Sequence, residues 1–185
     1  WGVEREASDR RADQGADVVG DEAADAGDDE ILEVIEEEIR QSELPASCLC
    51  FEITESAAVS NLDKAQSFID RLRALGCGIS LDDFGAGLSS FAYLKNFNVD
   101  MLKIDGSFIL DITENRISES MVAAITQVAK VMQLKTVAEY VECDKTRDAL
   151  VSLGVDYAQG HITGKPVSLD SALADFDELI QSSAS

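Results

Sequence analysis

A regular alternation of strand-like and helical segments begins near residue 29 and limits the fold class. Short runs rich in apolar and β-branched residues predict strands, and each is followed by a stretch with helical periodicity. The expected strands span residues 49–54, 78–83, 101–105, 136–139 and 155–159. The expected helices span residues 29–42, 57–75, 88–97, 115–133, 144–153 and 168–182. Strands and helices that alternate in this way predict an α/β fold with a parallel sheet.

Side chains of the first three expected strands alternate between an apolar and a polar face. In the third, Leu102 and Ile104 share one face while Lys103 points to the other, and the two strands before it alternate in the same way. A doubly wound sheet is covered by helices on both faces and would be apolar on both. A barrel instead keeps apolar side chains outside, under its helices, and polar ones inside. We therefore predict a TIM-like (β/α) barrel.

The N-terminal segment has a different composition from the rest of the chain. Its first 30 residues carry 11 acidic and 3 basic residues and show no amphipathic periodicity. We interpret residues 1–28 as an acidic Ala/Asp-rich segment that is either disordered or foreign to the domain. A complete barrel needs eight strands in about 250 residues. With about five βα units visible, residues 29–185 are expected to form a barrel domain that is incomplete at its N-terminal end.

Charged and amide side chains gather at the carboxyl ends of the expected strands, the edge where parallel β/α folds build active sites. These residues are Glu52, Glu55, Asp82, Asp83, Lys103, Asp105, Glu139 and Gln159. A single acid at a strand end is usually solvated or caps a helix. Several carboxylates in one mouth, however, repel each other unless cations lie among them, and Mg²⁺ or Mn²⁺ are the natural partners. Two such ions would activate water and stabilise charge on a phosphoryl group.

Composition excludes several other classes of protein. Thirty-six acidic residues against fifteen basic ones give a net charge of -21, whereas polymeric nucleic acid requires a basic surface. The four cysteines and one histidine are too scattered for a zinc module. No apolar run approaches the roughly 18 residues of a membrane span. We therefore expect no membrane segment and a cytoplasmic, reducing location.

Five motifs in order resemble those of the EAL domain family, whose members are bacterial cyclic-di-GMP phosphodiesterases on a TIM-like barrel. They are FEITES at residues 51–56, DDFGAGLSS at 82–90, LKID at 102–105, VAEYVE at 137–142 and DYAQG at 156–160. The resemblance covers about residues 30–170. It implies hydrolysis of cyclic-di-GMP to linear pGpG in second-messenger signalling, with two Mg²⁺ or Mn²⁺ ions. It also implies homodimers and upstream sensor or diguanylate-cyclase-like (GGDEF-type) domains as partners.

The resemblance also assigns roles to single residues. The implied metal ligands are Glu52, Asp82, Asp83 and Glu139. The implied catalytic residues are Lys103, which contacts the attacking water, Glu55, which anchors the loop after Asp83, and Gln159, which lies near the nucleophile. The implied substrate-binding residues are Asp105, Gln159, Gly164 and Pro166. His161 stands where the family commonly has tyrosine, so we expect no catalytic role for it.

Two features of the family are missing from this sequence. The Glu-Ala-Leu motif that names the family does not occur, nor does an asparagine expected on the next strand, and both supply metal ligands in the family. We therefore expect this chain to be weakly active or inactive as it stands. Three alternatives remain open: an enzyme completed by strands from elsewhere, a receptor that binds cyclic-di-GMP without cleaving it, and an inert truncation product.

Overall fold

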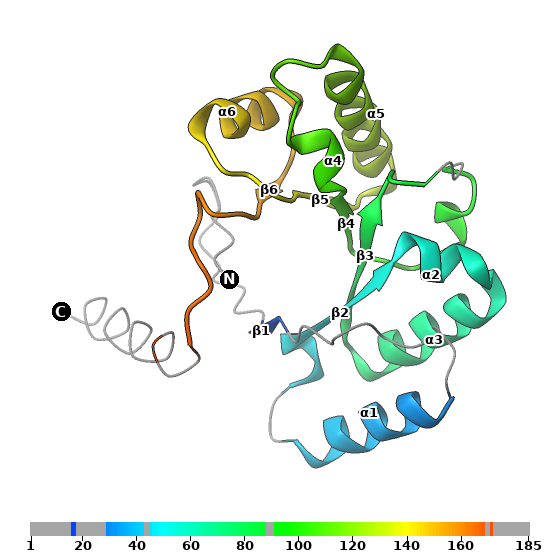
Figure 1. Ribbon diagram of the computed structural model, residues 1–185. Helices are drawn as coiled ribbons and strands as arrows, with labels where there is room; N and C mark the ends of the chain where they lie inside the picture. Colours follow the sequence, from blue (N-terminus) through cyan, green and yellow to red (C-terminus); the bar gives the residue numbers. More distant parts are fainter. Residues whose placement is uncertain (1–15, 18–28, 43–44, 88–90, 169–170, 172–185) are drawn as a thin grey trace.

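A parallel sheet with outer helices forms the framework of the molecule (Figure 1). The computed structural model describes residues 16–17, 29–42, 45–87, 91–168 and 171. Its strands are β1 (Ala16–Asp17), β2 (Leu49–Thr54), β3 (Gly78–Phe84), β4 (Met101–Ile104), β5 (Lys135–Ala138) and β6 (Tyr157–Ala158). Its α-helices are α1 (Asp29–Gln41), α2 (Glu55–Ser60), α3 (Leu62–Leu75), α4 (Gly106–Ile109), α5 (Arg116–Met132) and α6 (Asp144–Leu153).

The order of the strands identifies the sheet as part of a barrel. The strands lie in the order β1-β2-β3-β4-β5-β6, and every neighbouring pair is parallel. A doubly wound sheet would reverse its order at a switch point, and this sheet does not. Figure 1 shows helices α2, α3, α5 and α6 on the outer side of the curving sheet. The predicted TIM-like architecture is therefore confirmed.

The apolar face of the sheet packs under the helices, as the alternating pattern predicted. Ile79, Leu81, Leu102 and Ile104 are fully buried together with residues of α3 and α5. The opposite face carries Lys103 and its carboxylate partners. Burial of the aliphatic side chains is the main stabilising contribution of this layer, since each contributes about 1.5–3 kcal/mol.

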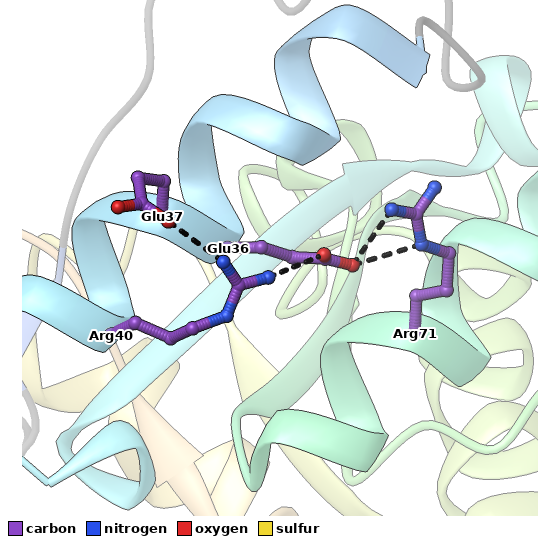
Figure 2. A network of polar contacts seen from close by, with 4 residues as sticks. All are labelled: Glu36, Glu37, Arg40 and Arg71. Atoms are coloured by element: carbon purple, nitrogen blue, oxygen red, sulfur yellow. Dashed lines mark hydrogen bonds and ion pairs between the residues drawn. The ribbon is translucent and has the colours of Figure 1, made fainter.

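Helix α1 is fixed to α3 by a cluster of ion pairs (Figure 2). Glu36 lies at its centre and accepts a hydrogen bond of 2.9 Å from Arg71 Nε on α3. On its other side it accepts a bond of 3.1 Å from Arg40, which also contacts Glu37. Arg40 and Glu37 are exposed while Arg71 and Glu36 are partly buried, so the cluster orients α1 more than it stabilises the fold.

Two of the expected helices differ from the structure. The helix expected over 57–75 is interrupted at Asn61, whose backbone leaves helical geometry and whose side chain caps α3 by accepting from Lys64 N. Asparagine favours this capping position over a helix interior. The described part of the segment 88–97 holds a 3-10 turn, Leu94–Asn96, and the backbone is already extended at Phe97, which ends any helix there.

The N-terminal and C-terminal segments are described only in part. Within residues 1–28, strand β1 is described, and its Ala16 pairs in parallel with Leu49 of β2. The rest of that segment lies outside the described residues, as does nearly all of the helix expected over 168–182. Among the helices that the structure describes, none combines the length and apolarity needed to cross a bilayer.

Candidate metal centre at the carboxyl ends of the strands

Lys103 lies at the centre of the candidate site. Its side chain projects from β4, is only 6 % exposed and places Nζ 2.9 Å from Glu52 Oε2, which belongs to β2. The same ammonium lies 3.2 Å from Asp82 Oδ1 on β3 and 3.0 Å from Glu139 Oε1, directly after β5. The structure thus brings together four of the residues predicted from the sequence, three from the neighbouring strands β2, β3 and β4 and one directly after β5.

The surroundings of Lys103 fix its protonation state. Burial by itself lowers the pKa of this lysine, but the hydrogen bond to Glu52 and the charges of Asp82 and Glu139 outweigh burial and raise the pKa above its usual value. Lys103 therefore remains an ammonium group at neutral pH. It can therefore donate hydrogen bonds and supply positive charge to the surrounding carboxylates.

Three carboxylates form a compact acidic cluster next to this lysine. One oxygen from each of Asp82, Asp83 and Glu139 lies within 4.8 Å of the others. Burial raises the pKa of Glu139 against the opposing charge of Lys103, with Asp82 adding to the rise. Partial burial also raises the pKa of Asp83, and the charges of Asp82 and Asp105 add to the effect.

The donor set of this cluster fits a hard divalent cation. Carboxylate oxygens are the ligands that Mg²⁺ and Mn²⁺ prefer. With Glu52 included, Lys103 neutralises only part of the carboxylate charge, so electrostatic repulsion remains for a cation to relieve. We therefore consider Glu52, Asp82, Asp83 and Glu139 as the groups that could hold metal, with the trio as the compact part of the set.

A β-bulge allows adjacent residues to contribute to the same cluster. In a regular strand Asp82 and Asp83 would point to opposite faces. The pairing of β3 with β4 shifts between Leu81 and Phe84, and Asp83 takes a positive φ of 53°. The amide of Asp83 donates a hydrogen bond of 2.9 Å to Asp82 Oδ1. The alternating pattern alone could not predict the extra residue of the bulge, which lets both carboxylates join the acidic cluster at the carboxyl ends of the strands.

Glu55 holds the loop that follows Asp83. Its side chain is buried, and Oε2 accepts a hydrogen bond of 2.8 Å from Gly85 N. The other oxygen accepts a hydrogen bond from the Tyr93 hydroxyl. Burial and the neighbouring Glu55 raise the pKa of Tyr93, so the phenol stays protonated and donates. The sequence analysis missed Tyr93, although a tyrosine within an apolar run signals a hydroxyl that needs a partner.

The remaining candidate residues lie around this centre or away from it. Asp105 caps α4 by accepting from Ser107 N at 2.9 Å, and its charge acts on Asp83. Gln159 is half-buried, and its backbone N–H donates to the backbone carbonyl of Ala138 at 2.8 Å, next to Glu139. Gly164 and Pro166 are exposed and do not take part in the ion pairs of Lys103.

Comparisons with known proteins point to one family. A protein-family model described as EAL domain matches residues 14–166. This match begins inside the segment 1–28, for which composition predicts disorder or a foreign origin. The chain is 46% identical over 134 residues to the cyclic di-GMP phosphodiesterase PdeF of Escherichia coli (strain K12), covering 72% of this chain and 18% of that protein. It is 38% identical over 147 residues to the cyclic di-GMP phosphodiesterase PdeB of Shewanella oneidensis, covering 80% and 17%.

Solved structures agree with the sequence comparisons. The structure titled PaMucR phosphodiesterase, c-di-GMP complex, superposes with a TM-score of 0.76 at 33% sequence identity. That match covers 80% of this chain and 60% of the other. The chain therefore spans about a fifth of the length of the two curated relatives and more than half of this structural neighbour.

Proposed function

This chain belongs to the EAL domain family, and from this premise we propose that it carries the active-site residues of a metal-dependent cyclic-di-GMP phosphodiesterase. The product would be the linear dinucleotide pGpG. The observation that carries the proposal is the cluster of Asp82, Asp83 and Glu139 beside the buried ammonium of Lys103. The names of the relatives, which are cyclic di-GMP phosphodiesterases, support the same chemistry.

The proposed metal ligands are Glu52, Asp82, Asp83 and Glu139, with Mg²⁺ or Mn²⁺ as the ion. When bound, such an ion lowers the pKa of coordinated water and offsets negative charge on a phosphoryl group. This also explains how a chain with a net charge of -21 could accept an anionic dinucleotide. The carboxylates provide the ligands, while the local positive charge comes from Lys103 and the cation.

Lys103 has two proposed roles in the reaction. As a fixed ammonium it keeps Glu52, Asp82 and Glu139 on one side of the mouth, and its N–H groups can orient the oxygen of the attacking water. In the overall step the water oxygen bonds to phosphorus and the bond from phosphorus to the ribose 3′-oxygen breaks. One water proton ends on that 3′-oxygen, so atoms and charge balance.

The proposed substrate contacts follow from the family resemblance and not from the geometry of the acidic cluster. Gln159 and Asp105 lie on the loops after β6 and β4, at the same edge as the acidic cluster. Gly164 and Pro166 belong to an exposed turn further along the chain. We propose these four residues as contacts of the dinucleotide. Homodimers, upstream sensor or GGDEF-type domains and a cytoplasmic location are further proposals of the same origin.

A hydrolysis assay with metal removal tests the proposed function. The purified chain is incubated with cyclic-di-GMP and Mn²⁺, and the products are separated by ion-exchange chromatography. Because two metal ligands of the family are missing from this sequence, we expect slow formation of linear pGpG, which stops with EDTA and resumes when Mn²⁺ is restored in excess. A Glu38→Ala variant, which removes an exposed carboxylate of α1, should match the wild type. Binding of cyclic-di-GMP without product would instead favour a receptor, and absence of both would contradict the proposal.

A further inference from the structure

The loop after β3 is held by a chain of two hydrogen bonds that begins at Tyr93. The hydroxyl of Tyr93 donates to Glu55 Oε1, and Glu55 Oε2 accepts from Gly85 N at 2.8 Å. Both side chains are buried, so neither bond competes with bulk water. A carboxylate held at both oxygens has little rotational freedom. The position of Gly85 therefore depends on a residue eight positions further along the chain.

Asp82 and Asp83 lie near the end of β3, and Gly85 lies in the turn from Asp83 to Ala86 that ends the strand. Asp83 has a positive φ of 53° and Gly85 one of 97°, so two residues of this short turn are in the left-handed region. One backbone hydrogen bond closes the turn, from Ala86 N to Asp83 O at 3.3 Å, and Asp83 N donates to Asp82 Oδ1 at 2.9 Å. Left-handed geometry at a non-glycine residue costs free energy and persists only where surrounding contacts impose it. The Glu55 carboxylate supplies one such contact from outside the turn, at Gly85 N, two residues after Asp83.

We infer that Tyr93 is a positioning residue, which acts through Glu55 and Gly85 to hold Asp82 and Asp83 in the arrangement that binds the divalent cation. This inference rests on the proposed function, because it takes the two aspartates as metal ligands. Tyr93 itself does not touch the acidic cluster; its ring packs edge-on against Phe97 with centroids 5.8 Å apart. Its hydroxyl donates the hydrogen bond that connects it to the turn through Glu55.

Three variants separate positioning from simple packing. Tyr93→Phe removes the hydroxyl and keeps the ring, whereas Phe97→Leu disturbs the ring packing and keeps the hydroxyl. Glu55→Gln removes the charge that links Tyr93 to Gly85. The double variant of Tyr93 and Glu55 completes a thermodynamic cycle, in which residues acting along one path are not additive.

The first readout is hydrogen exchange at the Gly85 amide, measured by NMR on the 185-residue chain without metal. We expect Tyr93→Phe to speed exchange at Gly85 about tenfold, the equivalent of one hydrogen bond. Phe97→Leu should leave exchange at Gly85 unchanged relative to its neighbours. Unchanged exchange at Gly85 in Tyr93→Phe would overturn the inference, whether or not the chain binds metal.

The second readout is the Kd for Mn²⁺ alone, measured by titration calorimetry. We expect about a tenfold weaker Kd in Tyr93→Phe, no comparable loss in Phe97→Leu, and little further loss when Tyr93→Phe is added to Glu55→Gln. An unchanged Kd in Tyr93→Phe would overturn the inference while the proposed function stands. A wild-type chain that binds no Mn²⁺ would contradict the proposed metal site, and Gly85 exchange would still decide whether Tyr93 controls the turn.

Discussion

The ammonium of Lys103 lies 3.0 Å from Glu139 Oε1, at the boundary between β4 and the end of β5. Both side chains are mostly buried, with exposed fractions of 6 % and 12 %. A buried ion pair stabilises a protein only when further groups satisfy both partners. For Lys103 these groups are Glu52 and Asp82, which makes the lysine the counter-charge of the whole acidic edge.

Replacement of Lys103 by methionine should therefore destabilise the metal-free protein. The variant keeps the aliphatic stem but leaves the carboxylates to repel each other, and we expect a loss of about 3 kcal/mol in the free energy of unfolding. Mn²⁺ should recover more stability in Lys103→Met than in the wild type, because it replaces the missing positive charge. Thermal unfolding with and without Mn²⁺ measures both effects. Equal stabilisation by Mn²⁺ in the two proteins would show that lysine and cation do not share these carboxylates.

The carboxylate of Asp156, at the N-terminal ends of β5 and β6, should contribute to stability in a way that is lost in acid. Its carboxylate accepts from Thr136 N at 3.0 Å and from Lys135 Nζ at 2.6 Å. Burial raises the pKa of Asp156, but these hydrogen bonds and the lysine charge outweigh it and hold the pKa below its usual 3.8. Because the folded pKa is the lower one, the contribution is complete above about pH 4 and is lost as pH falls through the folded pKa.

Comparison of Asp156→Asn with the wild type checks the direction in which this contribution to stability changes with pH. The variant should be less stable by about 1–3 kcal/mol near neutral pH, and the difference should shrink below pH 4. The matched control is Asp148→Asn, since Asp148 forms an exposed ion pair with Arg147 and should contribute little at any pH. Urea unfolding between about pH 2 and pH 7 gives the required curves. A difference that grows toward low pH would contradict the assignment.

Gly85 should tolerate no side chain. Its φ of 97° disfavours any other residue, and an added Cβ would lie 2.9 Å from the ring of Phe108 and 3.2 Å from Ile125 Cδ1. We expect Gly85→Ala to lower the free energy of unfolding by about 1–3 kcal/mol. Gly164→Ala is the control, because nothing lies within 4 Å of a Cβ there. Equal losses in the free energy of unfolding for the two substitutions, measured by urea unfolding, would contradict the close packing of Gly85 against Phe108 and Ile125.

Much of the framework could be predicted from local sequence signals. Residues 49–54 alternate apolar and polar side chains, and β2 spans those residues in the structure. The same alternation correctly placed Lys103 on the polar face with Glu52. These predictions succeed because successive side chains of a strand point to opposite faces, so a strand that buries one face has an apolar residue at every second position.

Features that depend on contacts distant in sequence could not be predicted in this way. The bulge at Asp83 depends on the register between β3 and β4, and no single residue of the strand indicates that register in the sequence. The hydroxyl of Tyr93 finds its partner 38 positions earlier, in Glu55. The expected helix over 88–97 was wrong in its described part, where a 3-10 turn forms and the backbone becomes extended at Phe97.

Hydrolysis by wild type and Asp82→Ala, compared side by side at saturating Mn²⁺, tests the central claim most directly. The claim is that the acidic cluster beside Lys103 carries out cyclic-di-GMP hydrolysis. Asp82 contacts Lys103 at 3.2 Å and belongs to the compact trio, so its loss should remove a metal ligand and lower kcat/KM at least about 100-fold. Slow formation of pGpG by the wild type, with none detected for Asp82→Ala, is the predicted result. Equal rates of pGpG formation in both proteins would contradict the claim.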